Sequence, residues 1–438
     1  MVTRDARLLR TRCTSHRKTL APFPQIPDWV ALEHRVAQIL TEQELYGWYF
    51  DEPAARELES SLRRELEGLT QLLRNRYPYV ADREFTPKRP NRTTGYVAGA
   101  PLTKLKEFSP TSRDHIAWVM TNLHGWKPDK ETASGKTAID ETVLKDIGTE
   151  EALQFFRCLE LTKQLGMLSE GKNAWLKLVR DNRIHHNCSV STNTHRCAHR
   201  NPNLAQVPSD LEFRKLFRAS DGYVMVGADL AGIELRMLAH YLARYDGGRY
   251  GDVLLNGDIH QENADKIGIS RRLVKTVTYA FLYGAGDQKI GLSYDQSLSP
   301  NKAKEKGAEI RAAYVAAIDG LDSLLTAVRS AGERGFIKSI DGRKISVDSP
   351  HKALNYLLQS SAGVVAKRWM VITNTPAVPD SHQLAFIHDE LQWETKPELA
   401  EFVKHHLEDS AALAGEYYNL RVPIAAEGKI GSNWAEVH

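Results

Sequence analysis

An acidic residue at the end of an apolar stretch is the first group in this chain that could hold a metal ion. Asp229 follows the short apolar run 223–226, which predicts a buried strand. Leucines at three- and four-residue steps then predict an amphipathic helix (Leu235, Leu238, Leu242). A carboxylate on such rigid backbone can bind a cation if a second carboxylate meets it. By itself, an aspartate before a helix is more often an N-cap.

The segment QLAFIHDELQWET supplies a second acidic group. Residues 384–387 and 391–393 predict two strands around a tight turn at His388, Asp389 and Glu390. Adjacent carboxylates at a hairpin tip repel each other unless a positive charge lies against them. A metal site is therefore one interpretation, and an exposed acidic turn is the other.

Two cations and two phenol rings follow one another at steps of four residues, namely Arg271, Lys275, Tyr279 and Tyr283. Four residues advance about 40° beyond a full helical turn, so these side chains share one slowly turning face. Fixed cations bind phosphate oxygens, and aromatic faces stack on bases. The pattern favours a triphosphate leading into a stacked base, but a solvated basic face with two core tyrosines fits it equally.

Two amides, Asn355 and Gln359, stand four residues apart in ALNYLLQSSAG, which predicts a helix. They face the same way. Neutral amides can meet the acceptors that every Watson–Crick pair presents in the minor groove, and so can sense pairing without reading sequence. Without further evidence, the two amides would be ordinary polar surface.

Length and composition indicate a soluble chain of two or three subdomains, because 438 residues exceed one compact core. No run approaches the roughly 18 apolar residues of a membrane span. Four scattered cysteines indicate a reducing compartment, so we expect the cytoplasm. Residues 1–26 carry six Arg and Lys against one acid, which predicts a disordered basic leader. A nucleic-acid arm and a mitochondrial presequence are the alternatives.

Element signals are clear in parts of the N-terminal half. Helices are expected over residues 29–74, with Asp51 as an N-cap and Pro53 in the first turn, and again over residues 148–180. A short capped helix is expected in SPTSRDHIAWVMTNLHGWKP. Residues 76–94 show no periodicity, which predicts a loop.

Taken together, these motifs resemble the family A (Pol I-like) DNA polymerases, and most closely the replicative polymerases of short-tailed bacteriophages. The resemblance runs from about residue 95 to the end, with weaker likeness from about residue 29. It is carried by long motifs in the family's order: YVAGAP, FSPTSRDHI, SEGKNAWLKLV, PNLAQVP, LNGDIH, FLYGAGDQKIG, DGRKISV, SPHKALNYLLQS, IHDE and EGKIGSNWAEVH.

The resemblance implies a two-metal catalytic centre. Asp229 and Asp389 would bind two Mg²⁺ ions, with Mn²⁺ as a substitute, and the Leu230 carbonyl would help. Glu390 would be a weaker, supporting carboxylate.

It also implies a nucleotide site. Arg271, Lys275 and His260 would hold the dNTP triphosphate, and Lys275 would give a proton to the departing pyrophosphate. Glu234 would fill the space of a ribose 2′-hydroxyl. Tyr279 would lie at the 3′ side of the sugar, which predicts ready acceptance of dideoxynucleotides.

Contacts with primer–template DNA follow from the same resemblance. Tyr283 would position the template base, Arg196, Asn355 and Gln359 would contact the minor groove near the primer end, and His388 would also contact DNA. The family's usual Thr-Gly-Arg is Thr194-His195-Arg196 here. This change leaves the conformation of that loop open.

The implied fold is α+β, a right hand with an antiparallel palm sheet and mainly helical fingers and thumb. We expect the thumb and N-terminal helical region over 27–180, the palm over 181–240 and 337–438, and the fingers over 241–336.

The chain differs from the phage polymerases that it resembles in two ways, and both affect which partner proteins we expect. We expect no 3′–5′ exonuclease in this chain, because only about 28 residues precede the thumb-like region. A separate exonuclease and a replicative helicase or primase are then candidate partners. Thioredoxin is not expected, because the stretch 76–94 is short.

Three rival functions stay open at this point. A reverse transcriptase and a single-subunit RNA polymerase share the chemistry, although Glu234 and Tyr279 favour deoxynucleotides and a DNA primer. A non-catalytic DNA-binding homologue is the third, and the two aspartates argue against it because binding alone does not require them.

Overall fold

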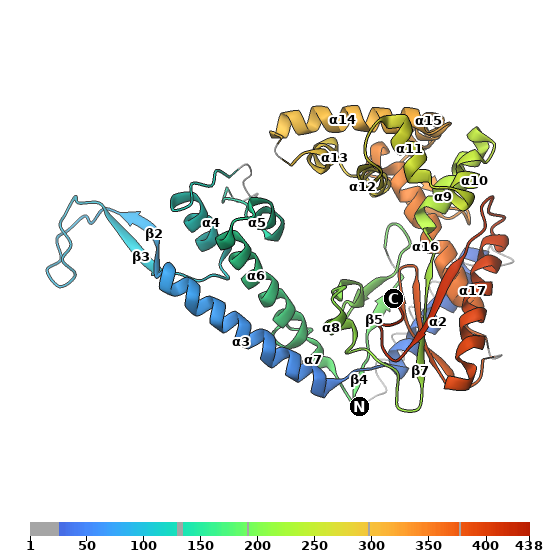
Figure 1. Ribbon diagram of the computed structural model, residues 1–438, viewed down its shortest axis with the longest axis horizontal. Coiled ribbons are helices and arrows are strands. Elements are labelled where there is room, and N and C mark those ends of the chain that lie inside the picture. The colour runs from blue at the N-terminus through green and yellow to red at the C-terminus, as the bar shows by residue number, and fades with distance from the viewer. Residues whose placement is uncertain (1–25, 129–134, 191, 297, 376–377) are drawn as a thin grey trace, which may run out of the picture. The chain divides into compact units, whose positions relative to one another are not determined.

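The computed structural model describes residues 26–128, 135–190, 192–296, 298–375 and 378–438. The predicted basic leader, residues 1–26, lies outside this part of the chain except for its last residue. The chain divides into two compact units, residues 50–184 and a larger unit formed by residues up to 49 together with 185–438 (Figure 1).

The smaller unit is mainly helical. Its helices are α3 (Glu52–Arg76), α4 (Arg113–Asn122), α5 (Glu141–Ile147), α6 (Glu150–Leu165) and α7 (Trp175–Leu178), with a π-helical turn at Gly166–Glu170 and the short strand β4 (Arg183–Ile184). Asp51 caps α3 by accepting from the Ala54 N–H at 3.1 Å, and Pro53 lies in the first turn, as predicted. Ser112 caps α4 in the same way. Aromatic side chains dominate the core, including Phe108 and Phe155.

The prediction of a loop over 76–94 was wrong. Residues Tyr79–Phe85 form β2, which pairs antiparallel with β3 (Leu102–Glu107). Val80 is the one residue of this ribbon that is buried. Strands that lie mostly in solvent need no alternation of apolar and polar residues, so the sequence carried no strand signal.

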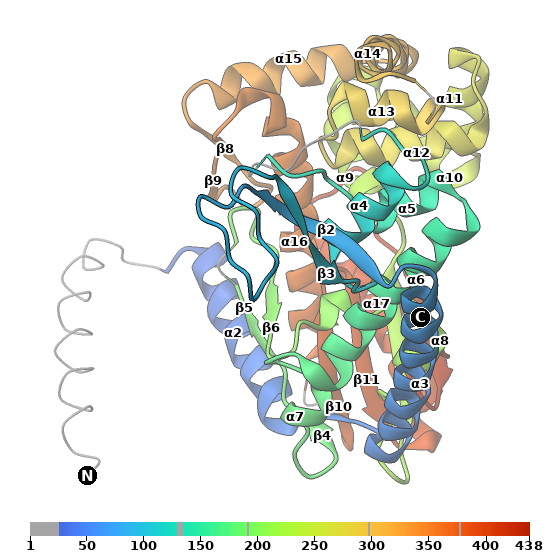
Figure 2. The ribbon, with the colours of Figure 1, turned by 90° about the vertical axis from the view of Figure 1, so that its left-hand side faces the viewer.

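The larger unit is built on a four-stranded antiparallel sheet in the order β10-β11-β7-β12. The strands are β7 (Val224–Leu230), β10 (Ser381–Ile387), β11 (Glu390–Thr395) and β12 (Ala426–Gly431). Helix α17 (Ala400–Tyr417) packs against β7 and β12, and α16 (Ala353–Thr373) packs against α17 and α2 (Asp28–Tyr46) (Figure 2). The strands predicted around residues 223–226 and 384–393 are thus the centre of the unit.

Among the described residues between β7 and β8, the chain forms the helices α9 (Ile233–Asp246), α10 (Arg249–Asn256), α11 (Ile259–Ile267), α12 (Arg271–Leu282), α13 (Asp287–Tyr294), α14 (Pro300–Ala317) and α15 (Leu321–Gly332). A hairpin of β8 (Phe336–Lys338) and β9 (Lys344–Ser346) follows. Further short elements are β1 (Trp48–Tyr49), β5 (Asn187–Ser189), β6 (Ala198–Arg200) and α8 (Leu211–Arg214). One hydrophobic core joins the sheet to these helices, from α2 to β12. The architecture is α+β, as predicted.

Helix α2 belongs to the larger unit, although the predicted thumb range 27–180 includes it. The Lys367 ammonium on α16 is completely buried, and the Glu33 carboxylate of α2 lies 2.8 Å away. Glu33 also pairs with Arg343 in the β8–β9 hairpin. A buried charge without a partner is strongly destabilising, so Glu33 ties α2 to this unit. The range 27–180 was predicted for the thumb together with an N-terminal helical region, and the assignment of residues to thumb, palm and fingers stays a prediction. None of the helices in the described ranges combines the length and apolar character of a membrane span.

Helices α13 and α14 approach each other through two glycines. A Cβ atom on Gly307 would lie 1.7 Å from the Asp287 carbonyl oxygen, and one on Gly291 would lie 1.8 Å from the Ala303 carbonyl oxygen. Both neighbours are backbone atoms, which cannot turn aside as a side chain can. Only glycine, which lacks a Cβ atom, fits at these two positions, so the two glycines allow the close approach of α13 and α14.

We predict that Gly307→Ala lowers the melting temperature by several degrees, because overpacking costs about 1–3 kcal/mol and here the backbone itself must move. Thermal unfolding followed by circular dichroism checks this. Glu305→Ala, at an exposed position of the same helix, is the matched control. Equal melting temperatures for Gly307→Ala and the control would show that α14 shifts without cost.

Candidate active site

Asp229 lies inside β7 and is not a helix cap. The following helix, α9, begins after Gly232, whose φ of 57° takes the left-handed conformation that favours glycine. In the sheet, Asp229 stands opposite Glu390 of β11 on one side and Glu427 of β12 on the other. Its carboxylate opens to solvent. The strand therefore presents this carboxylate among other acids, and the capping interpretation is wrong.

The turn between β10 and β11 brings Asp389 to the same place. His388 enters the turn with a φ of 62°, and the Asp389 carbonyl accepts from the Leu230 N–H at 3.0 Å. This bond fixes the turn against the residue that follows Asp229. Two carboxylates that are far apart in the chain are thus neighbours, one on β7 and the other in the turn before β11.

Burial and neighbouring acids raise the pKa of both aspartates. Partial burial, with the negative charge of Glu390, raises the pKa of Asp229 to about 6. Burial, with the charges of Asp229 and Glu234, raises the pKa of Asp389 to about 7, although Arg196 opposes the shift. Burial away from water and nearby like charges both disfavour the ionised form of a carboxylate. A hard divalent cation, which prefers oxygen ligands, would remove this penalty, so the two aspartates fit such an ion.

Glu390 is held by other side chains. It is buried, and its Oε1 accepts from the Trp434 Nε1–H at 2.6 Å and from the Gln392 amide. His438 lies 3.1 Å from its other oxygen. This carboxylate is therefore placed to support Asp229 and less free to bind a metal directly. We did not predict the roles of Gln392, Trp434 and His438 from the sequence. The terminal segment contributed to the family resemblance, but no role was assigned to its side chains.

The face of α12 places Arg271 and Lys275 in solvent, with Tyr279 half-buried. Arg271 donates to Asp258 at 2.7 Å, and Asp258 also caps α11 by accepting from the His260 N–H at 3.1 Å. The His260 ring lies 6.3 Å from the Tyr279 ring, between centroids. Asp258 thus brings the predicted phosphate-binding residues together, and sequence reasoning missed it.

Glu234 links three of the predicted site residues. Its carboxylate is buried, forms an ion pair with Arg196 and accepts from the Tyr283 hydroxyl at 3.1 Å. His195 next to the arginine has a φ of 58°, and its Nδ1 lies 2.6 Å from the Ser360 Oγ. The loop therefore keeps the left-handed conformation that a glycine would favour. This answers the question left by the Thr-His-Arg sequence.

The other predicted DNA contacts are less closely grouped. The Asn355 amide donates to the Leu282 carbonyl at the C-terminal end of α12, and Gln359 is half-buried one turn further along α16. His388 is half-buried, its ring lies 5.7 Å from that of His199, and its buried Nδ1 has no hydrogen-bond partner within the described residues. Asn355 thus ties α16 to α12, a contact that the sequence did not indicate.

Comparisons with known proteins settle the family. The model of DNA polymerase family A matches residues 98–436. The chain belongs to this family. It is 33% identical to the DNA-directed DNA polymerases of Enterobacteria phage T3 and Escherichia phage T7, in each case over 93% of this chain and 70% of the relative.

More distant relatives agree with this assignment. DNA polymerase I of Pseudomonas aeruginosa is 26% identical over 76% of this chain and 39% of its own length. The polymerase domain of Pol1 from M. smegmatis, solved in complex with DNA primer–template and dNTP, superposes with a TM-score of 0.72 at 21% identity, covering 92% of this chain and 70% of that one. The right-hand polymerase fold is thereby confirmed.

This family A polymerase is an enzyme of template-directed DNA synthesis, as predicted. Members of the family extend a primer with dNTPs by a mechanism that uses two divalent metal ions. The non-catalytic interpretation also fits poorly with the site, because two ionisable carboxylates held side by side serve catalysis and not binding alone.

We predict that divalent ions stabilise the metal-free protein more at pH 8 than at pH 5. Because the native aspartates have raised pKa values, the folded state binds more protons than the unfolded state between about pH 4 and 7, and stability from these groups falls as pH rises through that window. At pH 8 the carboxylates are ionised and free for a cation. Thermal melting with and without MgCl₂ checks this, and Asp389→Asn is the control that should lose most of the shift. Equal shifts in both proteins would contradict the assignment.

Proposed function

We propose that this chain extends the 3′-hydroxyl of a DNA primer with dNTPs using Mg²⁺, for which Mn²⁺ substitutes, held by Asp229, Asp389 and the Leu230 carbonyl. The observation that carries this assignment is the pair of aspartates, one in β7 and one in the turn that is hydrogen-bonded to Leu230, each with a raised pKa. When bound, the two ions activate the primer hydroxyl and stabilise the leaving pyrophosphate.

The residues of α12 and α11 bind the incoming nucleotide. Arg271 and Lys275 share the exposed face of α12 and hold the triphosphate, with His260 at its side. Lys275 forms no ion pair among the described residues, so its ammonium is free to meet the phosphates and to give a proton to pyrophosphate. Arg271 must exchange Asp258 for phosphate oxygens, an exchange that α12 can make by moving over the substrate.

Selection of the sugar and the template base falls to the residues around Glu234. Its side chain fills the space of a 2′-hydroxyl, and Tyr283 beside it positions the template base. Arg196, Asn355, Gln359 and His388 contact the DNA near the primer end. Tyr279 lies at the 3′ side of the sugar. Because Glu234 already binds Arg196 and Tyr283, these roles are coupled.

Primer–template DNA and dNTPs are therefore the proposed substrates. We further propose that the enzyme works in the cytoplasm without thioredoxin and with a separate exonuclease and a helicase or primase. The region 76–94 supports thioredoxin independence, because it is short and part of it, Tyr79–Phe85, is paired with β3. The absence of exonuclease activity from this chain stays a prediction.

Loss of either aspartate is expected to abolish primer extension. We predict that Asp229→Ala and Asp389→Ala each lower kcat by about a thousandfold or more, at least the scale of losing one preorganised electrostatic contact. A primer-extension assay with Mg²⁺ checks this. Asp409→Ala, an exposed residue of α17, is the control and should keep full activity. Strong extension by either active-site variant would refute the proposed mechanism.

The role of Glu234 gives a separate test. We predict that Glu234→Ala lowers discrimination against ribonucleotides by about 10–100-fold, because the space for a 2′-hydroxyl opens. Glu234→Gln keeps that volume and should keep most of the discrimination, even though it weakens the ion pair with Arg196. The ratio of kcat/KM for a dNTP and its ribonucleotide is the measurement. An unchanged ratio in Glu234→Ala would exclude the gate.

A further inference from the structure

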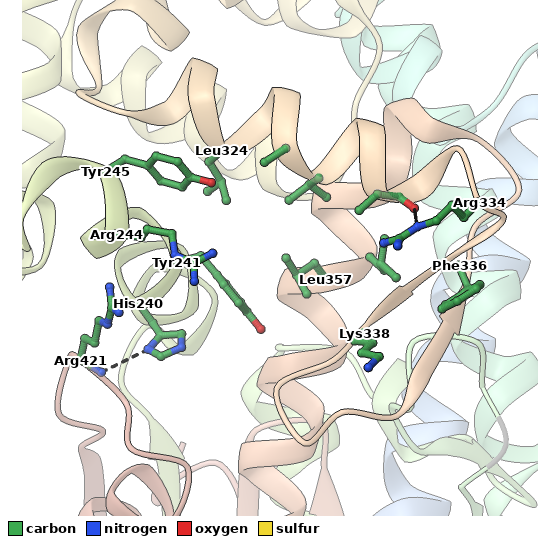
Figure 3. A pocket seen from close by; sticks show the side chains of 14 residues that line it. His240, Tyr241, Arg244, Tyr245, Leu324, Arg334, Phe336, Lys338, Leu357 and Arg421 are labelled. Atoms are coloured by element: carbon green, nitrogen blue, oxygen red, sulfur yellow. Dashed lines mark hydrogen bonds between the residues drawn. The ribbon is translucent and has the colours of Figure 1, made fainter.

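A cavity of about 660 Å³ lies in the larger unit between α9, α15, α16 and the β8 strand. Its walls are formed by the C-terminal half of α9, the apolar face of α15, Leu357 of α16 and Arg421 (Figure 3). Its size is typical of sites that bind a ligand as large as a nucleotide. None of the proposed catalytic or nucleotide-binding residues lines it.

Four cationic side chains surround this cavity. Arg244 and Arg421 stand at one end, and Arg334 and Lys338 stand at the other (Figure 3). No carboxylate lines the cavity, and none of the four cations forms an ion pair within the described residues. Many arginines of this chain do pair with acids, and its net charge is only +3. An uncompensated cluster of one sign attracts an anion.

Aromatic and apolar groups also line the cavity, with Phe336 at the end that carries Arg334 and Lys338 (Figure 3). The Tyr241 ring projects into the space, and its hydroxyl is held by the Ser361 Oγ at 2.8 Å. The Phe336 ring lies 5.8 Å from the Arg334 guanidinium and 4.4 Å from the Lys344 ammonium. Such rings, flanked by cations, are typical of surfaces on which the bases of single-stranded nucleic acids stack.

His240 adds a hydrogen-bond donor. Its Nδ1 accepts from the Arg421 N–H at 3.2 Å, so Nε2 carries the proton of the neutral ring. Burial, together with the charge of Arg421, lowers the pKa of this imidazole to about 4, and the ring is neutral at physiological pH. The contact also fixes the loop that carries Arg421 against α9.

The cavity lies on a different side of α16 from the amides assigned to the primer–template. Leu357 stands two residues from Asn355 and two from Gln359, which is about 200° around the helix in each direction. Leu357 faces the cavity. A ligand can therefore occupy it without displacing DNA from the proposed minor-groove contacts.

We propose that this cavity is a second binding site for single-stranded DNA. The four cations bind backbone phosphates, and an unstacked base lies on Tyr241, Phe336 and the apolar wall of Leu357. The aromatic rings of Tyr241 and Phe336 favour a nucleic acid over an acidic peptide. The carboxylates of such a peptide would pair with the cations, but nothing in it would stack on the rings. A single strand fits better than a duplex, in which stacking already covers each base. DNA synthesis always presents such a strand, namely the template ahead of the primer.

The test measures fluorescence anisotropy of a labelled oligo(dT) of twenty nucleotides, without dNTPs, on the full chain saturated with an unlabelled hairpin primer–template. We expect binding that weakens at least tenfold in Arg244→Ala/Arg421→Ala, with a salt slope smaller by roughly 0.7 for each phosphate that the variant no longer neutralises. Arg249→Ala is the control, because this arginine pairs with Glu262 and Asp319 outside the cavity. Extension of a hairpin with a short overhang should be unchanged in all variants, which confirms that they fold.

Three results would overturn the proposal. The first is equal oligo(dT) affinity in the wild type and the double variant. The second is binding of oligo(dT) to the free chain but not to the hairpin-saturated chain, which would place it in the polymerase cleft. The third is binding of labelled polyglutamate in preference to oligo(dT), which would assign the cavity to an acidic polypeptide. Because the assay needs no catalysis, failure of the active-site assignments leaves it intact.

Discussion

The antiparallel pairing of β7 with β11 is the constraint on which the rest of this polymerase depends. It sets Asp229 opposite Glu390, and the turn that precedes β11 then holds Asp389 against the backbone of Leu230. Burial, together with like charges held this close, disfavours ionisation, and the hydrophobic core that joins the sheet to the helices must compensate for that cost. The same repulsion makes the site receptive to divalent cations, so local instability and function have one cause.

Acidic residues also organise the nucleotide side of the site. Asp258 holds Arg271 and caps the helix of His260, and Glu234 holds Arg196 and Tyr283. Each carboxylate gathers groups that the proposed reaction must release or redirect when substrate binds. Substrate phosphates and sugar can replace these internal partners, which gives a physical route from correct binding to a changed arrangement of α12.

Helix α16 contributes residues to two proposed binding sites, which lie on different sides of the helix. One carries the amides assigned to the primer–template, and the other contributes Leu357 to the cationic cavity. Its buried ammonium, Lys367, ties it to α2 through Glu33. A helix held so firmly can support two DNA contacts at once, because binding on one side need not move the other.

Sequence by itself determined what depends on local order. The strand before Asp229, the cap at Asp51, the helical face of Arg271 and Lys275 and the family motifs all follow from periodicity and residue type, and the comparisons confirmed the family. Only the tertiary structure decided which distant groups meet: Trp434 with Glu390, Asp258 with Arg271, and Arg421 with His240. The exposed β2–β3 ribbon also stayed invisible, because strands without a buried face leave no alternating pattern. Neighbours along the chain interact through fixed covalent spacing, whereas these contacts depend on sheet register and core packing, which no short stretch of sequence encodes.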